Sequence, residues 1–528
     1  METFATFLCC LLLGLIVLAM VPAALANAHP QALRRLVTGM ICLELVLAVL
    51  LAAASWAGGG IPLSLRVVDA WPSASVHFGV YYDGVTGLML LLVAFIGFVV
   101  SRFSIRYLEG ETTQGRYFQW MGFTVGAVSL MAISGNLLQF FAAWVLTSWG
   151  LHQLLLHYRH RPAARRAAWT KFAISRLGDA FLIAALVLTF QSFGTFDLSH
   201  LLAEARKLAG SESLAASQSA IAWLLMLGAI TKSAQFPFHI WLPDTMETPT
   251  PVSALMHAGI VNAGGYLVIR MSPLFALGAE SLLVLALIGA VTACFASVVM
   301  ITQPSVKRAL AYSTIAQMGF MMLQCGLGAF SAAMLHIIAH SLYKAHAFLS
   351  SGSVVSQSRS TDAGISHVSK RAASTPALFG AAAVTLSAYL SLSVGLDLGG
   401  HSKPGGFLLA FVFFLSLTAG GWPVFSFGRR STTLVGIVGI VGMSLAYVVS
   451  YLLIDRWLHP VLPAVAFPAS SLFVAVGIAV LFALLFVLHV ILKRGLRLKW
   501  LAPLRIHAVN GFYVDAMFHR IFSTLAKS

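Results

Sequence analysis

The first candidate for chemistry is a lysine in the middle of an apolar run. In the stretch "LGAITKSAQFPFHIW", Lys232 has apolar residues on both sides, and Pro237 follows five residues later. A proline lacks the N–H of a helical hydrogen bond, so it predicts a break in the helix near this point. Ionisable groups are costly inside a membrane span, and broken helices at that depth line polar cavities. We therefore predict that Lys232 carries protons; the alternative is that its side chain snorkels to the membrane surface.

The second candidate is a stripe of titratable side chains later in the chain. In "LHIIAHSLYKAHAF", the residues His336, His340 and Lys344 stand at i, i+4 and i+8, so a helix presents all three on one face. Histidine titrates near neutrality and can pass a proton between its ring nitrogens. His257, at the start of an earlier apolar run, is equally consistent with a structural role. The presence of the three titratable residues later in the chain favours a relay role for it. The stripe predicts a proton relay within the membrane, with a polar seam between helices as the alternative.

An acidic residue lies in another apolar run. In "SRLGDAF", Asp179 follows Arg176 by three residues, which predicts a partly buried ion pair near the cytoplasmic end of its span. The pair either biases the charge of Lys232 or locks two helices together. The residues alone leave both roles open.

Composition defines the environment of these side chains. The chain has 528 residues, of which 59% are hydrophobic and 9% are charged, whereas soluble chains contain about 25% charged residues. Apolar runs of about 20 residues, enough to cross about 30 Å of hydrocarbon, recur along the sequence. The first run has no basic region before it, so we expect a retained helix and not a cleaved signal. The predicted fold class is an all-α polytopic membrane protein with about fifteen spans, at 4–26, 36–57, 79–102, 116–135, 136–157, 168–192, 219–242, 251–274, 281–302, 307–327, 328–357, 375–395, 405–427, 432–454 and 468–492.

The loops between these spans predict the orientation. Loops rich in lysine and arginine fall on one side of the membrane, which places the N-terminus outside and the C-terminus in the cytoplasm by the positive-inside rule. The net charge of +16 is spread over many short loops, so it reflects topology and gives little support to a nucleic-acid partner. The basic loops contain Arg34/Arg35, Arg102/Arg106, "HYRHRPAARR", Lys307/Arg308, Lys370/Arg371, Arg429/Arg430 and "KRGLRLK".

Cofactor and metal motifs are not indicated. The five cysteines fall within predicted spans and form no CxxC pattern, so we predict neither a disulfide framework nor a zinc site. No glycine-rich nucleotide loop follows a strand pattern, which argues against an ATP-driven pump. No nucleophile accompanied by a base is evident, so we expect a transport subunit and not an enzyme.

The stretch "TKSAQFPFHIWLPDTMETPTPVSALMHAGIVNAGGYL" resembles the signature of the antiporter-like proton-conducting family, which includes large membrane subunits of respiratory complex I and of Mrp antiporters. The resemblance continues through "VKRALAYSTIAQMGF" and the histidine stripe, over roughly residues 80–360. It implies that Lys232 is a central proton carrier, that His257 relays from it, and that His336, His340 and Lys344 continue the path. It also implies two inverted five-helix repeats, each with one broken helix. The implied segments are 1–115, a first repeat at 116–274, a second repeat at 281–427, and 428–528, with helix breaks near Pro237 and Pro423.

The sequence departs from the family pattern at two carriers. The family usually has a glutamate after a tryptophan in the fifth span, but "QFFAAWVLTSWGLHQLL" has Val145 there, and His152 is the nearest titratable residue. The second repeat lacks the usual lysine or glutamate in its broken helix, since no lysine occurs between Lys403 and Lys493. Both departures leave the exit path of a complex I subunit in question.

Within the family, the sequence resembles the shorter DabB-type membrane subunits of inorganic-carbon accumulation complexes. That resemblance implies a soluble cytoplasmic DabA-like partner, similar to a zinc-dependent β-carbonic anhydrase, which would hold the zinc. It also implies a bacterial inner-membrane location and contact with membrane lipid. A respiratory complex subunit and a cation/proton antiporter subunit are the alternatives.

Overall fold

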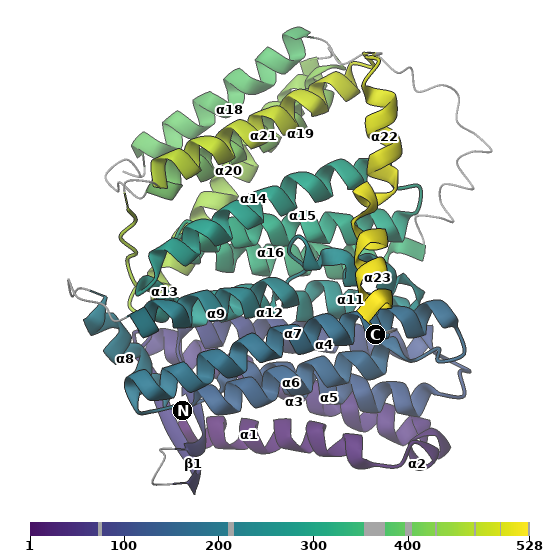
Figure 1. Cartoon of the computed structure of the whole chain (residues 1–528), viewed down its shortest axis with the longest axis vertical. Coiled ribbons are helices and arrows are strands. Elements are labelled where there is room, and N and C mark those ends of the chain that lie inside the picture. Colours follow the sequence, from purple (N-terminus) through teal and green to yellow (C-terminus); the bar gives the residue numbers. More distant parts are fainter. Residues whose placement is uncertain are drawn as a thin grey trace.

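A computed structural model gives the fold and describes residues 1–71, 76–209, 216–352, 375–395, 404–427, 430–468, 471–496 and 498–525. Long helices lie side by side with their axes roughly along one direction, and α1 lies at the opposite end of the longest dimension from α18 and α21 (Figure 1). The helices are α1 (Glu2–Val17), α2 (Ala23–Ala28), α3 (Pro30–Ala57), α4 (Gly84–Tyr107), α5 (Gln114–Ile133), α6 (Leu137–Leu155), α7 (Pro162–Phe193), α8 (Leu198–Leu208), α9 (Ala216–Lys232), α10 (Trp241–Asp244), α11 (Thr250–Ala258), α12 (Ala263–Arg270), α13 (Ser272–Ala276), α14 (Ala279–Thr302), α15 (Val306–Gly326), α16 (Phe330–Leu349), α18 (Thr375–Gly395), α19 (Pro404–Phe425), α20 (Arg430–Leu458), α21 (Ser471–Lys493), α22 (Leu501–Val509) and α23 (Val514–Leu525).

The helical membrane architecture is confirmed, and the number of spans stays a prediction. Each predicted range overlaps a helix or a pair of short helices. Within the described ranges, nine helices are long and apolar enough to cross a membrane. The first predicted span is shorter than expected, because α1 ends at Val17 and Pro22 separates it from α2. The chain is therefore a multi-pass membrane protein.

A two-stranded antiparallel hairpin precedes α4, and the sequence analysis missed it. Strands β1 (Leu63–Trp71) and β2 (Val76–Tyr82) pair with Leu63 opposite Tyr82. The predicted third span began at residue 79, but the helix begins only at Gly84. Asp83 sets this start, because its carboxylate accepts a hydrogen bond from the Thr86 N–H at 2.9 Å and so caps the helix.

The seventh and eighth predicted spans are both interrupted. Helix α9 ends at Lys232, and the chain continues through a cis Phe236–Pro237 bond and the 3₁₀ turn η3 (Phe238–Ile240). The eighth span divides into α11 and α12 around η5 (Ile260–Asn262), a break that the sequence analysis did not predict. These two breaks place non-helical backbone inside the bundle.

Pro423 does not break its helix as expected. It lies within α19, two residues before the helix ends at Phe425. The proline removes the one N–H that would donate to the Ala419 carbonyl, but the helix continues past it, and the Ser426 N–H donates to the Trp422 carbonyl at 3.1 Å.

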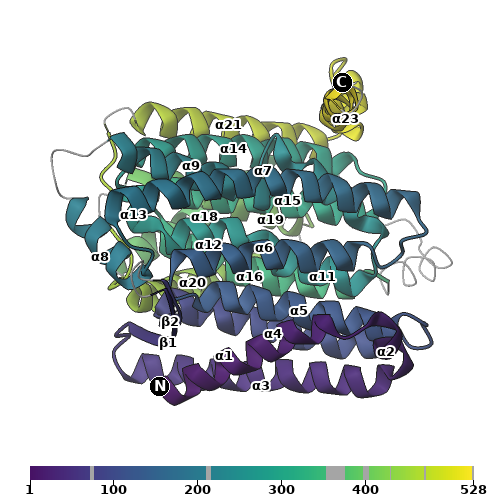
Figure 2. The same cartoon turned by 60° about the horizontal axis from the view of Figure 1, so that its bottom comes forward.

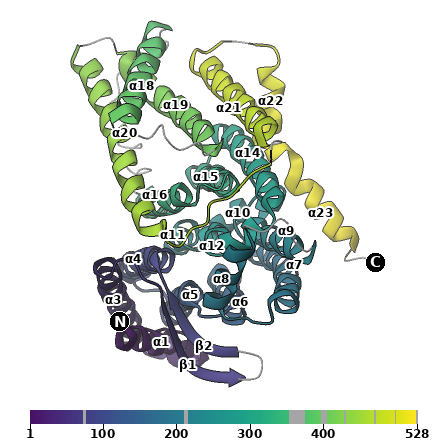
Figure 3. The same ribbon diagram turned by 90° about the vertical axis from the view of Figure 1, so that its left-hand side faces the viewer.

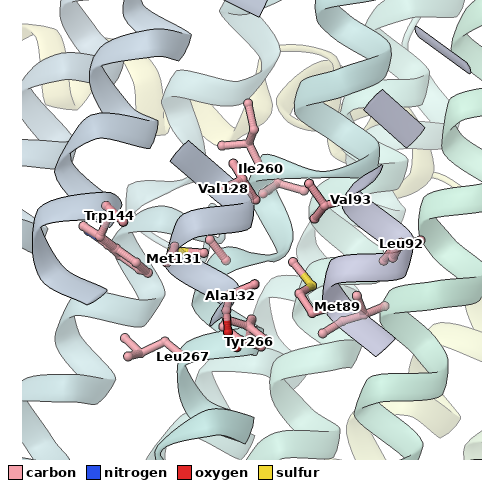
Figure 4. Packing of buried hydrophobic residues seen from close by; sticks show 14 of the residues in the cluster. Met89, Leu92, Val93, Val128, Met131, Ala132, Trp144, Ile260, Tyr266 and Leu267 are labelled. Carbon is pink, nitrogen blue, oxygen red and sulfur yellow. Dashed lines mark hydrogen bonds between the residues drawn. The ribbon is translucent and has the colours of Figure 1, made fainter. Parts of the chain in front are cut away.

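Apolar and small residues pack the bundle. In its centre, Met89, Val128, Met131 and Tyr266 lie close together, with Tyr266 beside Ala132 (Figure 4). Between α14 and α15, a Cβ added at Gly289 would meet the Leu323 backbone nitrogen at 2.5 Å, and one at Gly319 would meet the Ala293 nitrogen at 2.5 Å. Small residues thus let these two helices approach closely, as in other membrane bundles.

The two ends of the bundle differ. The hairpin, α8 and α13 lie at one end, which we call the hairpin end (Figure 2). The opposite end, which we call the basic end, carries α2 and α23 (Figure 2). Here α23 extends past α9 and α7 (Figure 3). The described residues that define the basic end are Arg34, Arg35, Arg102, Arg106, Arg159, Arg165, Arg166, Lys307, Arg308, Lys493 and Arg494.

At the hairpin end, Asp197 ties the loops together. Its carboxylate accepts hydrogen bonds from the Ser199 hydroxyl at 2.5 Å and the His200 N–H at 3.1 Å, and lies 3.5 Å from Arg66 and 3.6 Å from His77. Burial alone would raise the pKa of Asp197, but these hydrogen bonds and cations hold it below its ordinary value.

Candidate proton pathway

Lys232 lies buried between α6, α7 and α9. Its Nζ donates a hydrogen bond to the Trp144 carbonyl at 3.1 Å and lies 4.4 Å from the centroid of the Trp144 ring. The helix break after Lys232 leaves this side chain at the end of α9, where it reaches across to α6. The lysine is therefore held inside the bundle, and its side chain does not snorkel to a surface.

Trp144 also joins Lys232 to the acidic residue. The indole N–H of Trp144 donates to the Asp179 carboxylate at 3.1 Å. Arg176 lies 2.6 Å from the other carboxylate oxygen, so the expected ion pair is present, with side-chain exposures of 38% and 8% for Arg176 and Asp179. Val145, at the place of the usual glutamate, directly follows Trp144. The nearby acid is thus Asp179 of α7, which reaches Lys232 through an indole ring.

A second buried lysine, Lys171, was missed by the sequence analysis. Its Nζ donates to the carbonyl and the hydroxyl of Ser148, both at 2.7 Å. Lys171 precedes Asp179 by eight residues, so both side chains fall near one face of α7. That spacing was the available signal, but the lysine lies near the end of its span, where basic residues usually mark topology. We call Lys171, Lys232, Trp144 and Asp179 the lysine cluster.

The predicted stripe on α16 lies against α11 and α15. His340 Nε2 lies 3.3 Å from the His257 carbonyl oxygen, and its ring centroid is 6.0 Å from that of His336. Lys344 is fully buried, and its Nζ donates to the Leu310 carbonyl at 3.1 Å. His336 is partly exposed, and its ring lies against Phe320, with centroids 5.5 Å apart.

His257 is linked through a threonine hydroxyl to the Leu310 carbonyl, which also accepts the hydrogen bond from Lys344. Its Nδ1 lies 3.0 Å from the Thr314 hydroxyl, which donates to the Leu310 carbonyl at 3.1 Å. Thr314, on α15, was not among the expected residues. We call His257, His336, His340 and Lys344 the histidine cluster; it ends at Lys344, near the basic end.

A polar bridge lies between the two clusters at the helix breaks. The Ser233 hydroxyl, next to Lys232 in the chain, donates to the Val261 carbonyl at 2.6 Å. The next residue, Asn262, donates from its amide to the Ser341 hydroxyl at 2.8 Å, and Ser341 adjoins His340 on α16. The Asn262 amide oxygen and His257 Nε2 are buried without a hydrogen-bond partner among the described atoms. The break in the eighth span thus turns backbone and amide groups toward both clusters.

The polar network does not extend into the next two helices. Helices α18 and α19 contain no Asp, Glu, His, Lys or Arg. His152, the nearest titratable residue to Val145, instead places Nδ1 3.2 Å from the Ala168 carbonyl and packs against Trp169. Hydrogen bonds at the two helix breaks therefore place polar groups between the lysine cluster and the histidine cluster.

Other buried ionisable side chains lie outside both clusters. Arg270 at the end of α12 forms a bidentate pair with Asp83, with N···O distances of 2.7 and 2.8 Å. Glu44, in the middle of α3, is buried and accepts a hydrogen bond from the Ser129 hydroxyl. The Arg270 pair fixes α12 to the start of α4, because breaking such a pair would leave an uncompensated buried charge.

No metal-binding group is seen among the described residues: they contain no cluster of three or more His, Cys, Asp or Glu side chains. The five cysteines are free.

Comparisons with known proteins define the class of this chain. A family model described as NADH:quinone oxidoreductase/Mrp antiporter, TM, matches residues 134–427. A second, described as NADH-Ubiquinone oxidoreductase (complex I), chain 5 N-terminus, matches residues 71–118. The chain therefore belongs to the antiporter-like family of membrane transport subunits found in NADH:quinone oxidoreductase and Mrp complexes.

Within this family the chain is similar to proteins named DabB. The probable inorganic carbon transporter subunit DabB of Hydrogenovibrio crunogenus is 34% identical over 470 residues, which cover 87% of this chain and 86% of that protein. Subunit DabB2 of Halothiobacillus neapolitanus is 48% identical over 277 residues, covering 52% of this chain and 50% of that protein. The chain thus spans about half the length of the curated Halothiobacillus relatives that it matches.

A solved structure shares the fold. The Mrp complex of Dietzia sp. DQ12-45-1b contains a chain with a TM-score of 0.65 and 23% sequence identity, over 99% of this chain and 59% of that one.

Proposed function

We propose that this chain conducts protons through the membrane and couples their gradient to inorganic carbon accumulation by a soluble, carbonic-anhydrase-like partner. Protons would pass from the lysine cluster through the polar bridge to the histidine cluster, with Lys232, His257, His336, His340 and Lys344 as carriers. Catalysis would take place in the partner, which would hydrate CO2 to bicarbonate in one direction.

The observation that carries the proposal is the set of buried polar groups, hydrogen-bonded at two helix breaks, that lies between Lys232 and the histidine cluster. Ionisable residues within a membrane are expensive and are therefore candidates for transport sites, and packing alone gives no reason to place polar groups between them at two helix breaks. Asp179 and Arg176 would bias the charge of Lys232 through Trp144. The relatives named inorganic carbon transporter subunits support the choice of substrate.

The proposed path ends near the basic end and does not continue into α18 and α19. Because α18 and α19 lack an ionisable group, a complete antiport circuit of two half-channels has no second carrier there. A path that ends beside a bound protein, which consumes the energy of the gradient, fits this arrangement better than a cation/proton antiporter or a quinone-linked pump.

The partner would dock on the basic end, facing the cytoplasm of a bacterial inner membrane. Lys493, Lys499 and Arg505 are exposed there, and arginine is favoured at interfaces. Aromatic side chains of the C-terminal segment pack partly against the bundle. Phe512 packs against Phe295, and Phe518 against Phe238, with ring centroids 5.7 and 6.4 Å apart.

Purification from native membranes in mild detergent, followed by metal analysis, tests the proposal. We expect a soluble zinc protein to co-purify with the chain, with zinc stoichiometric to that partner. Isolation of the chain alone and free of zinc would overturn the coupling, and recovery with respiratory subunits would favour the quinone-linked alternative.

A further inference from the structure

An open groove between α4 and α16 lies beside the histidine cluster without containing any of its members. Its volume is about 390 Å³, within the range of roughly 300–1,000 Å³ typical of ligand sites. Phe95 and Leu342, on its two walls, are 41% and 44% exposed. The groove is lined mainly by apolar side chains, among them Phe95, Ile96, Val99, Leu342 and Leu349.

Two arginines extend the α4 wall toward the basic end. Phe95, Val99, Arg102 and Arg106 are spaced at i, i+4, i+7 and i+11, so they follow one stripe of the helix. Arg102 and Arg106 are exposed, and neither forms an ion pair within 4.0 Å among the described residues. On the facing helix, Ser350 lies at the same end of the groove.

We propose that this groove binds an anionic phospholipid, with an acyl chain between α4 and α16 and the phosphate at Arg102 and Arg106. An apolar groove on the outer surface of a membrane bundle faces acyl chains, which fill it without loss of hydrogen bonds. Arginine recognises phosphate through paired N–H donors. Along α4, the apolar part of the groove is followed by the two arginines. This order matches that of the acyl chain and the phosphate headgroup of a lipid in one leaflet.

The site also has a consequence for the proposed relay, and this consequence rests on the proposed function. The groove wall on α16 includes Ala345 and His346, next to Lys344 in the chain. A lipid seated there supports α16 against α4 on the side opposite the histidine cluster. Its removal is therefore expected to loosen the position of Lys344.

Lipid retained by the purified, intact complex tests the site directly. We expect mass spectrometry of the wild-type complex to find a tightly held anionic phospholipid. The variant Arg102→Ala/Arg106→Ala should lower its apparent affinity about thirty-fold, since each arginine near the membrane surface contributes about 1 kcal/mol. The control Arg34→Ala/Arg35→Ala makes the same charge change at the basic end and should leave retention unchanged.

A second variant separates the apolar part from the charged part. Val99→Trp should fill the groove and expel the lipid without changing charge, whereas Val46→Trp, on the exposed side of α3, should not. Equal retention by all variants, or equal retention of neutral and anionic lipids, would overturn the proposal, as would a protein segment occupying the groove in a structure of the complex. Because retention is measured without transport, this result is independent of the proposed function.

Discussion

The polar bridge at Asn262 makes the sharpest prediction about the pathway. Asn262→Leu keeps a similar volume but removes hydrogen bonds to the Ala258 carbonyl at 2.9 Å and the Ser341 hydroxyl at 2.8 Å. Neutral hydrogen bonds contribute about 1 kcal/mol each, so the free energy of unfolding should fall by about 2 kcal/mol. During transport the unpaired Asn262 amide oxygen would accept a hydrogen bond from a protonated carrier, and a hydrogen bond to a charged group contributes about 1.5–3 kcal/mol. Proton conduction should therefore fall roughly ten- to a hundredfold.

The assay is proton flux into liposomes that contain the purified complex, followed with an internal pH dye under an imposed membrane potential. Asn510→Leu is the matched control, because the Asn510 amide also donates to a carbonyl four residues earlier, but on an exposed helix. Asn262→Ser retains a hydroxyl and should keep part of the rate. Wild-type flux through Asn262→Leu, at equal protein per liposome, would refute the bridge.

Three further predictions concern the relay and its supports. His340→Leu should slow proton flux far more than it lowers the melting temperature, whereas the surface control His160→Leu should change neither; a parallel loss of both would indicate a structural seam. Arg270→Gln should lower the free energy of unfolding by about 3–5 kcal/mol. The double variant Asp83→Asn/Arg270→Gln should lose less stability than the sum of the two single variants. Thermal unfolding of the three variants checks this, and strict additivity would contradict a coupled pair. Asp197→Asn should lower stability at neutral pH. Because the pKa of Asp197 is below its ordinary value of about 3.9, this difference should shrink as the pH falls below about 4, and a constant difference across pH would exclude the carboxylate as its source.

The sequence was most informative where proline or charge interrupts an apolar run. Pro237 predicted the break after Lys232, and the i, i+4, i+8 spacing of His336, His340 and Lys344 predicted a shared face on α16, where His340 and Lys344 are buried and His336 is partly exposed. Such signals are local, because a missing N–H or a helical period acts within a few residues. The sequence could therefore place these side chains on their helices before the fold was known.

What the sequence could not give depends on contacts between distant elements. The break at Gly259–Asn262 has no proline, and it is held by contacts such as that from Ser233 to Val261. From the sequence, Lys171 looks like one of the basic residues that flank a span on the cytoplasmic side. Its contact with Ser148 shows that it lies inside the bundle. Pro423 shows the opposite case: a local signal predicted a break, but the proline falls in the final turn of α19, where its missing N–H matters little.

Gradient-dependent carbon uptake tests the central claim most directly. Cells that express this chain with its partner should be compared with cells carrying Lys232→Ala, using labelled inorganic carbon with and without a protonophore. Lys207→Ala, which removes an exposed lysine paired with Glu204, is the control. Wild-type and control cells should accumulate carbon and lose this ability with the protonophore, and Lys232→Ala cells should not accumulate carbon although the complex still assembles. Full uptake by Lys232→Ala at normal expression, or wild-type uptake that the protonophore does not affect, would contradict the account.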